Sequence, residues 1–544
     1  MASNPTRKTE VQAYSFEVRR MNSALVRRDP VMLHDPLRTH SRATVVGVVL
    51  GIVGLLGFLI FGILKPNQQP PDSGIVIGRE SGQIYVKTDN PEMLIPTFNL
   101  ASARLILLGQ QQKAAQGQGQ GGPENIEVVE PTIVPDERLA NIPRGRLQGI
   151  PGADVELPKA DQRISDNWAV CHNLPLNPNY APEERIKRAM EEQETAVLAG
   201  LPSSQLGKPL APNEAIYVET PGTQERYLLY RPAEDVNNRR GIVRAQIPRP
   251  NEPDGRVIAE ALRLNDRQPR SMSLGLLNAV EKVDQLVPPE PEGRGEPSEM
   301  VELQAGTKTT IGEVFVADPA GNAQFFVVLR HGKQRISQAA AELIRLKYSV
   351  TKELQQVSPD RLDDIPDAPE DERLDLDDYP VTMPTVIDME TYPTTCLGWE
   401  LANGKGRTTL YVGNEGLPFP KRADGQPLRV QVGKANEERI AIHYFYMPPG
   451  RAAAVHVATS EAGFESGPIQ LISDRGLRFG VPDLATAKAL GLEPLRPAPA
   501  SIVKLLPTGA SLNVQDAQMT YDSFEPPPGS ESPLGQDIPV QTSD

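Results

Sequence analysis

The chain has 544 residues, a formal net charge of −14 at neutral pH, 53 prolines and 44 glycines. The acidic balance argues against nucleic acid as a partner, because binding to nucleic acid rests largely on lysines and arginines that neutralise phosphates. The prolines, glycines and low aromatic content (5%) favour strand-and-turn domains joined by linkers over a helical bundle. We therefore expect an α+β protein.

A basic arm, residues 1–42, comes first in the chain. Apolar residues recur along it at three- and four-residue steps, which predicts an amphipathic helix that ends near Asp29. We expect its apolar stripe to dock on a neighbouring protein or on anionic lipid, and a floppy charged tail that only sets membrane orientation is the alternative. The stripe consists of Val11, Tyr14, Val18, Met21 and Leu25.

The next segment, residues 43–64, is apolar and contains no charged residue. A helix of this length is about 33 Å long and crosses a hydrocarbon core of roughly 30 Å. No small-residue cleavage step follows it, so it is predicted to be an anchor rather than a removed signal. Arginines precede the span and only Lys65 follows closely, which predicts a cytoplasmic N-terminus and a periplasmic remainder.

Glycines gather on one face of this predicted span. Turning each residue by about 100° places five of them on the same side. Such a face permits close contact with another membrane helix, although glycine is common in membrane spans and a plain anchor is the alternative. The five are Gly47, Gly51, Gly54, Gly57 and Gly62.

Beyond the span, a β-rich hairpin followed by a short helix recurs, which predicts an elongated body of small repeats around a two-part central domain. The repeats are expected at 75–109, 212–282, 301–346 and 467–513, and the central parts at 126–211 and 386–466. The remaining segments are predicted to be a flexible Gln/Gly insertion (110–125), a Pro-rich linker (283–300), a helix and acidic linker (347–385) and a disordered tail (514–544).

The chain has two cysteines, Cys171 and Cys396. Both are expected outside the cytoplasm, where disulfides persist, and one bond between them is favoured over two separately buried thiols. Their surroundings mirror each other, Trp168-Ala-Val-Cys171 against Cys396-Leu-Gly-Trp399, which suggests two related apolar pockets joined by the bond.

No catalytic or metal-binding pattern stands out. None of the four Gly-Lys pairs has the Gly-x-x-x-x-Gly-Lys-Ser/Thr spacing of a phosphate-binding loop, and no histidines are spaced as metal ligands. His172 is expected to be a surface histidine rather than part of a Cys–His pair with Cys171, because neighbouring strand residues face opposite sides. The acidic stretch 359–379 lacks the EF-hand order and is expected to be solvated. We expect no cofactor, no metal and no enzymatic activity.

Several stretches, in this order, resemble one known family: RRDPVMLHDPLRTHSRA, NLASARLI, IPRGRLQGIPGA, NWAVC, TTCLGWE and LRFGVPDLATAKALGL. The family is EccB, the single-pass membrane core component of the type VII (ESX) secretion system of mycobacteria and related actinobacteria. The resemblance implies a membrane complex with EccC, EccD and EccE, an associated MycP protease, and a disulfide between the two cysteines. It also implies periplasmic repeats similar to a cell-wall-binding phage lysin subunit.

Three functions follow as hypotheses. The leading one is a structural scaffold of the ESX inner-membrane complex, which supports export and holds protomers together in the periplasm through self-association of the outer body. The alternatives are a membrane-tethered cell-wall-binding module and an enzyme acting on ATP or peptidoglycan. Some family members are labelled ATPases, but no phosphate-binding loop in this chain supports that label.

Overall fold

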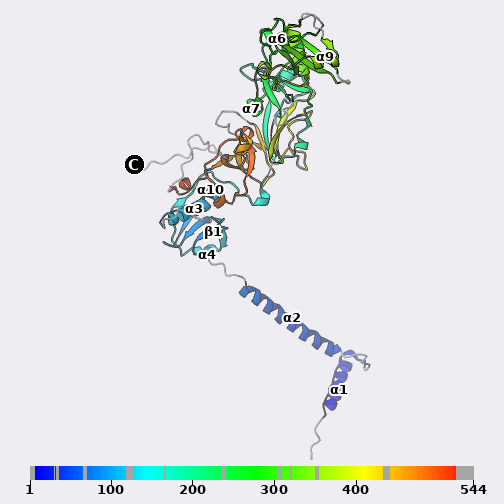
Figure 1. Cartoon of the computed structure of the whole chain (residues 1–544). Helices are drawn as coiled ribbons and strands as arrows, with labels where there is room; N and C mark the ends of the chain where they lie inside the picture. The colour runs from blue at the N-terminus through cyan, green and yellow to red at the C-terminus, as the bar shows by residue number, and fades with distance from the viewer. Residues whose placement is uncertain are drawn as a thin grey trace, which may run out of the picture. The chain divides into compact units, whose positions relative to one another are not determined.

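The computed structural model describes residues 7–29, 31, 36–64, 70–117, 126–164, 167–233, 241–265, 267–303, 308–318, 322–348, 354–432 and 442–521. The chain divides into two compact units, Met1–Gln69 and Pro70–Asp544. The described residues of the first unit form helices, and those of the second form five β-sheets with short helices between them (Figure 1).

The first unit contains helices α1 (Lys8–Arg27) and α2 (Pro36–Leu64). Helix α1 begins where the backbone N–H of Arg7 donates to Glu10 Oε2 at 3.1 Å, and it ends at Arg28, whose φ of 56° lies in the left-handed region. Within α2, the stretch Arg42–Phe61 has a mean hydropathy of 2.7 and is long and apolar enough to cross a membrane. The predicted basic helix and the predicted membrane-length helix are therefore both present.

Four of the sheets in the described part of the second unit share one topology: three antiparallel strands, a helix, and a strand that returns parallel to the first strand. The first has β1 (Gly74–Gly78), β2 (Ile84–Thr88), β3 (Met93–Thr97), α3 (Leu100–Gly117) and β4 (Thr132–Val134). The second has β9 (Glu214–Glu219), β10 (Arg226–Tyr230), β11 (Val243–Gln246), α6 (Pro253–Ala261) and β12 (Arg270–Ser271). The third has β14 (Val314–Ala317), β15 (Gln324–Leu329), β16 (Gly332–Ile336), α8 (Gln338–Tyr348) and β17 (Gln355–Val357). The fourth has β23 (Ala453–Ala458), β24 (Ile469–Ile472), β25 (Arg478–Val481), α10 (Leu484–Leu490) and β26 (Arg496–Pro499).

Additional elements extend these sheets or connect them. Strands β5 (Leu147–Gln148) and β27 (Thr520–Tyr521) join the first sheet, and β13 (Glu281–Lys282) and β18 (Thr385–Val386) join the second. The remaining α-helices outside the fifth sheet are α4 (Asp136–Leu139), α7 (Leu274–Ala279), α9 (Pro359–Asp364), α11 (Ala500–Val503) and α12 (Val514–Ala517).

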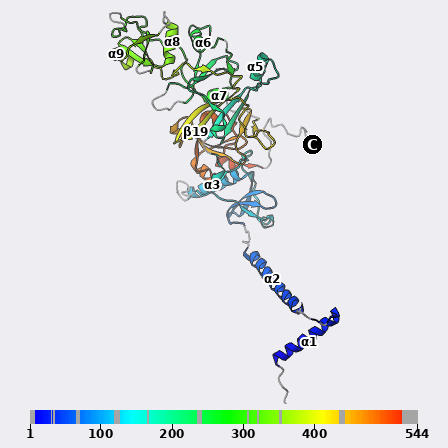
Figure 2. The ribbon, with the colours of Figure 1, turned by 90° about the vertical axis from the view of Figure 1, so that its right-hand side faces the viewer.

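The fifth sheet, which we call the central sheet, combines strands from two distant parts of the chain in the order β21-β22-β7-β6-β19-β20-β8. Its strand β19 is labelled in Figure 2. The first part contributes β6 (Asn167–Asn173), β7 (Glu194–Ala199) and β8 (Lys208–Pro209), with α5 (Pro182–Glu191) between β6 and β7. The second contributes β19 (Thr394–Ala402), β20 (Lys405–Gly413), β21 (Val430–Gln431) and β22 (Tyr444–Tyr446). Strands β6 and β19 pair along their lengths and join the two parts.

The sheets share hydrophobic cores rather than burying separate ones. Trp168 of the central sheet belongs to the same buried cluster as Ile216 of the second sheet and Val455 of the fourth. A second cluster joins Leu105 of α3 to Phe479 of the fourth sheet, and α3 contacts α10, which lies beside it (Figure 1). Each small sheet therefore uses its neighbours to cover its apolar face.

Part of the predicted Gln/Gly insertion is helical. Helix α3 continues to Gly117, and the ammonium of Lys113 donates to Gln518 Oε1 at 3.1 Å near the end of α12. Glutamine, alanine and lysine are good helix formers, and the contact with α12 supports the last turns. Residues 118–125 lie outside the described residues.

Two other segments expected to be flexible are also packed. Pro288 and Pro289 are buried within the predicted linker. This segment is joined to the second sheet, where the N–H of Leu286 donates to the carbonyl of Gln246, and to the third sheet, where the hydroxyl of Ser298 donates to the carbonyl of Leu329. The predicted disordered tail begins with α12 and β27, which pairs with β5, and residues 522–544 lie outside the described residues. Composition alone missed both because the stabilising contacts come from distant parts of the chain.

The structure also places strands across the predicted repeat boundaries. Strand β4 lies in the range 126–211 but pairs with β1, and β17 lies after 346 but pairs with β14. Strand β23 lies in the range 386–466 but pairs with β24. The return strands are short and separated in sequence from the helix before them, so hairpin patterns do not reveal them.

Candidate functional site

The two cysteines and the two tryptophans lie on one antiparallel strand pair. Cys171 of β6 lies opposite Cys396 of β19, and Trp168 lies opposite Trp399 in the same register. The predicted disulfide joins Cys171 to Cys396, and both residues are fully buried. The mirrored sequences are thus two paired strands, and the expectation of two related apolar pockets is wrong.

The cysteines and tryptophans face opposite sides of the central sheet, because successive side chains on a strand alternate. The disulfide lies in a small cluster with Leu206 and Phe419, whereas the tryptophans belong to the large shared core. The bond therefore joins the two parts of the central sheet beside a core that the central, second and fourth sheets share.

His172 is buried, which corrects the prediction of a surface histidine. It lies on β6 on the face that the second sheet covers, and its Nε2 lies 2.9 Å from Gln193 Oε1. Burial lowers the pKa of His172 to about 4, so the ring is neutral at physiological pH. The hydroxyl of Ser271, on β12, donates to the same oxygen of Gln193 at 3.2 Å. His172 thus takes part in a polar contact between sheets.

Arg270 makes a second buried polar contact between the same sheets. Its guanidinium donates to the hydroxyl of Thr395 and to the carbonyl of Tyr392. Burial lowers the pKa of Arg270 to about 10, so the group stays charged at neutral pH. Among the described residues, its Nε has no hydrogen-bond partner. Sequence reasoning missed Arg270 because its burial depends on the packing of β12 against β19.

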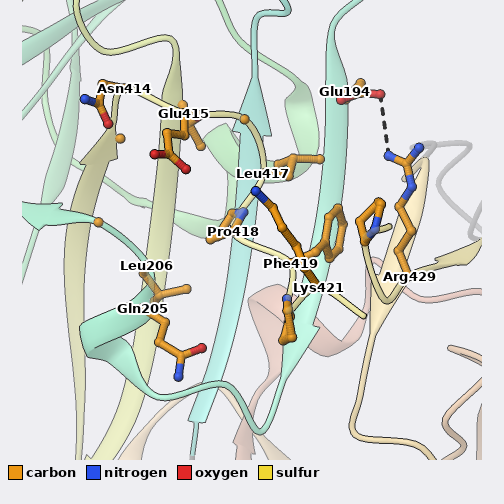
Figure 3. A pocket seen from close by; sticks show the side chains of 16 residues that line it. Glu194, Gln205, Leu206, Asn414, Glu415, Leu417, Pro418, Phe419, Lys421 and Arg429 are labelled. Atoms are coloured by element: carbon orange, nitrogen blue, oxygen red, sulfur yellow. Dashed lines mark hydrogen bonds and ion pairs between the residues drawn. The ribbon is translucent and has the colours of Figure 1, made fainter. Parts of the chain in front are cut away.

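A groove of about 560 Å³ lies beside the disulfide cluster (Figure 3). Leu206, Leu417 and Phe419 supply apolar lining, and Arg429 lies 3.9 Å from Glu194. Of the described residues that line the groove, none is a histidine, cysteine or serine. The charged side chains of the lining are those of Glu194, Glu415, Lys421 and Arg429.

The predicted docking stripe lies entirely within α1. Tyr14, Met21 and Leu25 are between 64% and 78% exposed, Val11 is 55% exposed, and Val18 is half-buried. A stripe of this size is available to a partner surface or to lipid, and its role stays a prediction.

The predicted glycine face lies within α2. At Gly47, Gly51, Gly54 and Gly57, an added Cβ would meet no described atom within 4 Å beyond the adjoining residues and the backbone of the helix itself. Gly62 lies in the same helix. The face is open in this chain alone, so helix packing there also stays a prediction.

Two lysines of the Gly-Lys pairs, Lys333 and Lys208, already have polar partners in the structure. Lys333 is buried, donates to the carbonyl of Ile365 and lies 3.3 Å from Asp367. Lys208 lies 3.2 Å from Glu214. Within the described ranges, no three His, Cys, Asp or Glu side chains form a group that could hold a metal ion.

Comparison with known proteins shows which family the chain belongs to. A family model described as type VII secretion system ESX-1, transport TM domain B, matches residues 3–526. The chain belongs to the EccB family.

EccB proteins of known systems are similar over almost the whole chain. The protein named ESX-5 secretion system ATPase EccB5 from Mycobacterium tuberculosis (strain ATCC 25618 / H37Rv) is 30% identical, over 95% of this chain and 94% of that protein. A chain in the structure of an intact ESX-5 inner membrane complex is 26% identical with a TM-score of 0.63, and the match covers 99% of both chains. A chain in the periplasmic assembly from the ESX-5 inner membrane complex is 25% identical with a TM-score of 0.63, over 86% of this chain and 99% of that one.

Proposed function

We propose that this EccB-family protein is a structural scaffold of a type VII secretion inner-membrane complex. In this role it supports protein export and holds protomers together through its outer body. The observation that carries the proposal is the match, over 99% of both chains, to a chain of an ESX-5 inner membrane complex. The shared cores and the disulfide between distant strands also suit a part that must keep its shape.

The proposed topology has one membrane crossing. Residues 1–42 lie in the cytoplasm, residues 43–64 cross the inner membrane, and the rest of the chain is periplasmic. The support is the excess of arginines before the span and a disulfide after it. We further propose that the four sheets of shared topology are repeats of one unit around a two-part central domain, which the pairing of β6 with β19 supports.

The proposed partners follow from the arrangement of exposed faces. The stripe on α1 and the glycine face of α2 would dock on the EccC, EccD and EccE membrane components, and the outer body on other copies of itself. The MycP protease and the cell wall are further proposed partners of the outer body. The α1 stripe supports the first part most directly, because four of its five side chains are exposed among the described residues.

The docking role is tested by placing charges on the stripe. In the triple variant Val18→Asp, Met21→Asp and Leu25→Asp, we expect loss of the other membrane components when the protein is purified from mild detergent. Buried carboxylates without partners are strongly unfavourable, so a docked stripe cannot tolerate them.

The matched control places the same three charges on the opposite face of α1. The variant Gln12→Asp, Ala13→Asp and Ser23→Asp should retain the partners. The unfolding temperature of the outer body should be unchanged in both variants, because α1 belongs to the other compact unit. Full retention of partners by the stripe variant, or equal loss in both, would refute docking through the stripe.

The alternative of ATP hydrolysis is kept because relatives carry ATPase in their names. Of the lysines that follow glycine, Lys333 is already engaged by backbone and carboxylate oxygens. A lysine so engaged would first have to leave these partners to bind a phosphate. The buried position of Lys333 therefore supports the scaffold over the enzyme.

A further inference from the structure

A cavity of about 900 Å³ lies between β16, an edge strand of the third sheet, and the acidic segment that runs beside it. Its described lining includes residues 334–336 of β16 on one side and Leu374, Leu376 and Asp377 on the other. The volume lies within the range of roughly 300–1,000 Å³ that is usual for binding sites. We call residues 369–377, which supply the second side, the strap.

The outer edge of β16 presents main-chain groups to the acidic segment. The N–H of Lys333 donates to the carbonyl of Pro366 at 2.8 Å, and the carbonyl of Lys333 accepts from the N–H of Ala368 at 2.8 Å. Main-chain groups alternate between the two edges of a strand, so the N–H and carbonyl of Arg335 lie on this same edge. No described residue pairs with them there. The strand edge is therefore open at Arg335 within the part of the chain that the structure describes.

The residues just before the strap show which kind of segment this edge accepts. The ammonium of Lys333 donates to the carbonyl of Ile365 and lies 3.3 Å from the carboxylate of Asp367. Lys333 and Asp367 form a parallel bridge. A Cβ at Gly332 would lie 2.5 Å from the carbonyl oxygen of Pro366, so the two main chains are in close contact. An acidic, extended segment thus already pairs with one end of β16.

The strap is held beside the rest of the edge by two polar contacts. Glu372 accepts from the N–H of His331 at 3.2 Å and also contacts the imidazole ring. The side-chain amide of Gln334 donates to the carbonyl of Leu374 at 2.9 Å and accepts from its N–H at 2.8 Å. Leu374 and Leu376 are only half-buried. The strap therefore lies along the edge without forming a strand ladder, and few contacts have to break for it to leave.

An open strand edge recognises an extended segment through main-chain hydrogen bonds, and the neighbouring side chains supply specificity. Here the side chains of Lys333 and His331 already contact carboxylates, which favours an acidic segment. Pairing of β16 with β16 of a second copy would bring the cations Lys333 and Arg335 against their counterparts. Like charges on directly opposed residues are unfavourable. The edge therefore fits an acidic partner segment better than a second copy of itself.

We propose that the strap is an autoinhibitory segment of the third sheet. When it leaves the edge of β16, an acidic, extended segment of a partner protein pairs with the main chain at Arg335. The strap and the partner segment compete for the same edge. This binding edge goes beyond the scaffold role proposed above and does not depend on it.

The test uses the full-length protein in detergent micelles and fluorescence anisotropy. The probe is a labelled peptide with the sequence of the strap, PEDERLDLD. The release variant, Glu372→Gln and Leu374→Pro, weakens both contacts of the strap, because proline has no N–H to donate to Gln334. We expect the release variant to bind the peptide at least tenfold more tightly than the unchanged protein, in which the tethered strap competes.

The matched control makes the same two kinds of substitution elsewhere in the strap, Glu370→Gln and Asp375→Pro. Glu370 is exposed, and Asp375 accepts from the N–H of Asp377 at 3.3 Å within the strap. The control should bind the peptide as weakly as the unchanged protein. The single variant Glu372→Gln keeps the main chain of the strap intact and should bind at least threefold more tightly, so the test does not depend on the proline.

A second pair of variants tests the main-chain pairing. Arg335→Pro, added to the release variant, removes the N–H of the open edge and leaves the bonds between β15 and β16 in place, because that N–H points away from β15. We expect it to lower the affinity for the peptide at least tenfold. Arg335→Ala keeps the N–H and should lower the affinity less than threefold.

Three results would overturn the proposal: equal binding by the unchanged protein and the release variant, binding that survives Arg335→Pro, or no binding by the release variant. The last would follow if residues 234–240, next to Ala233 of the lining, fill the cavity. Sedimentation velocity provides the remaining outcome. Self-association of the release variant in place of peptide binding, lost with Arg335→Pro, would assign the edge to a second copy and overturn the partner assignment.

Discussion

Removal of the bond between Cys171 and Cys396 should destabilise the central sheet by an amount that the fold allows us to work out. The bond links residues 225 apart in sequence. In the chain-entropy model, closing a loop of this length stabilises the folded state by about 5 kcal/mol, and measured values are often lower. Strands β6 and β19 keep their backbone pairing without the bond. We therefore expect a loss of about 3–5 kcal/mol rather than complete unfolding.

The two tryptophans of the chain provide the assay. Trp168 and Trp399 lie opposite each other on the strands that the disulfide joins, and they are 1% and 7% exposed. Their emission therefore reports unfolding of this strand pair together with the core that it shares with the second and fourth sheets. With a urea slope of about 3 kcal/mol/M, the upper end of the usual range as suits a large unit, the midpoint should fall by on the order of 1–2 M in the variant Cys171→Ala and Cys396→Ala.

The matched control is the unchanged protein, reduced in denaturant and refolded with reductant, because both thiols are fully buried in the fold. It lacks the bond but keeps both sulfur atoms, and its midpoint should lie close to that of the double variant. Coinciding midpoints for the oxidised and the reduced protein would refute the reasoning that the bond stabilises this strand pair.

Three further predictions concern charge, catalysis and orientation. His331 lies 3.3 Å from Glu299 and contacts Glu372, which raises the pKa of His331 and lowers that of Glu372. These contacts should hold most firmly between the ordinary pKa values of glutamate and histidine, about 4.3 and 6.5, and weaken as the pH rises through the raised histidine value. The protection of the amides of residues 370–374 against hydrogen exchange, relative to their intrinsic exchange rates, should therefore fall above that value, and His331→Gln should remove this fall. ATP hydrolysis by the purified full chain should be absent or unchanged by Lys333→Gln and Lys405→Gln, and a rate abolished by either would overturn the non-enzymatic proposal. A cysteine placed at Ser3 should resist a membrane-impermeant thiol reagent in intact cells, whereas one in the C-terminal tail should react, and the reverse pattern would overturn the proposed topology.

Local patterns in the sequence were enough to predict the elements that depend on near neighbours. Helix α1 follows from its apolar steps, and α2 from its length and lack of charge. The hairpin strand Gly312-Glu-Val-Phe-Val316 and its partner strand can also be predicted, because the alternation of side chains along a strand involves only neighbouring residues. The mirrored Trp-x-x-Cys spacing marked the partners of the disulfide, but only the register showed that they form one strand pair.

Features that depend on distant packing escaped sequence reasoning. Return strands such as β4 and β17 have three residues each and gain their stability from the first strand of their own sheet. His172 looks like an exposed polar residue until the second sheet covers it. Arg270 belongs to a two-residue strand, and its role emerges only when β12 and β19 come together. Burial of a polar group thus depends on tertiary packing and cannot be predicted from the spacing of residues along one helix or strand.

The hydrophobic cores join one sheet to the next in a continuous series, and this arrangement supports the proposed scaffold role. One cluster joins the first sheet to the fourth, a second joins the fourth to the central sheet and the second sheet, and a third joins the second sheet to Leu343 of α8 beside the third sheet. Interiors packed in this way transmit displacement rather than absorb it. The disulfide lies near the middle of this series, where strands from the two distant parts of the chain pair. We infer that a force on either terminal sheet reaches the central strand pair directly, which is what a part that holds neighbouring copies in place requires.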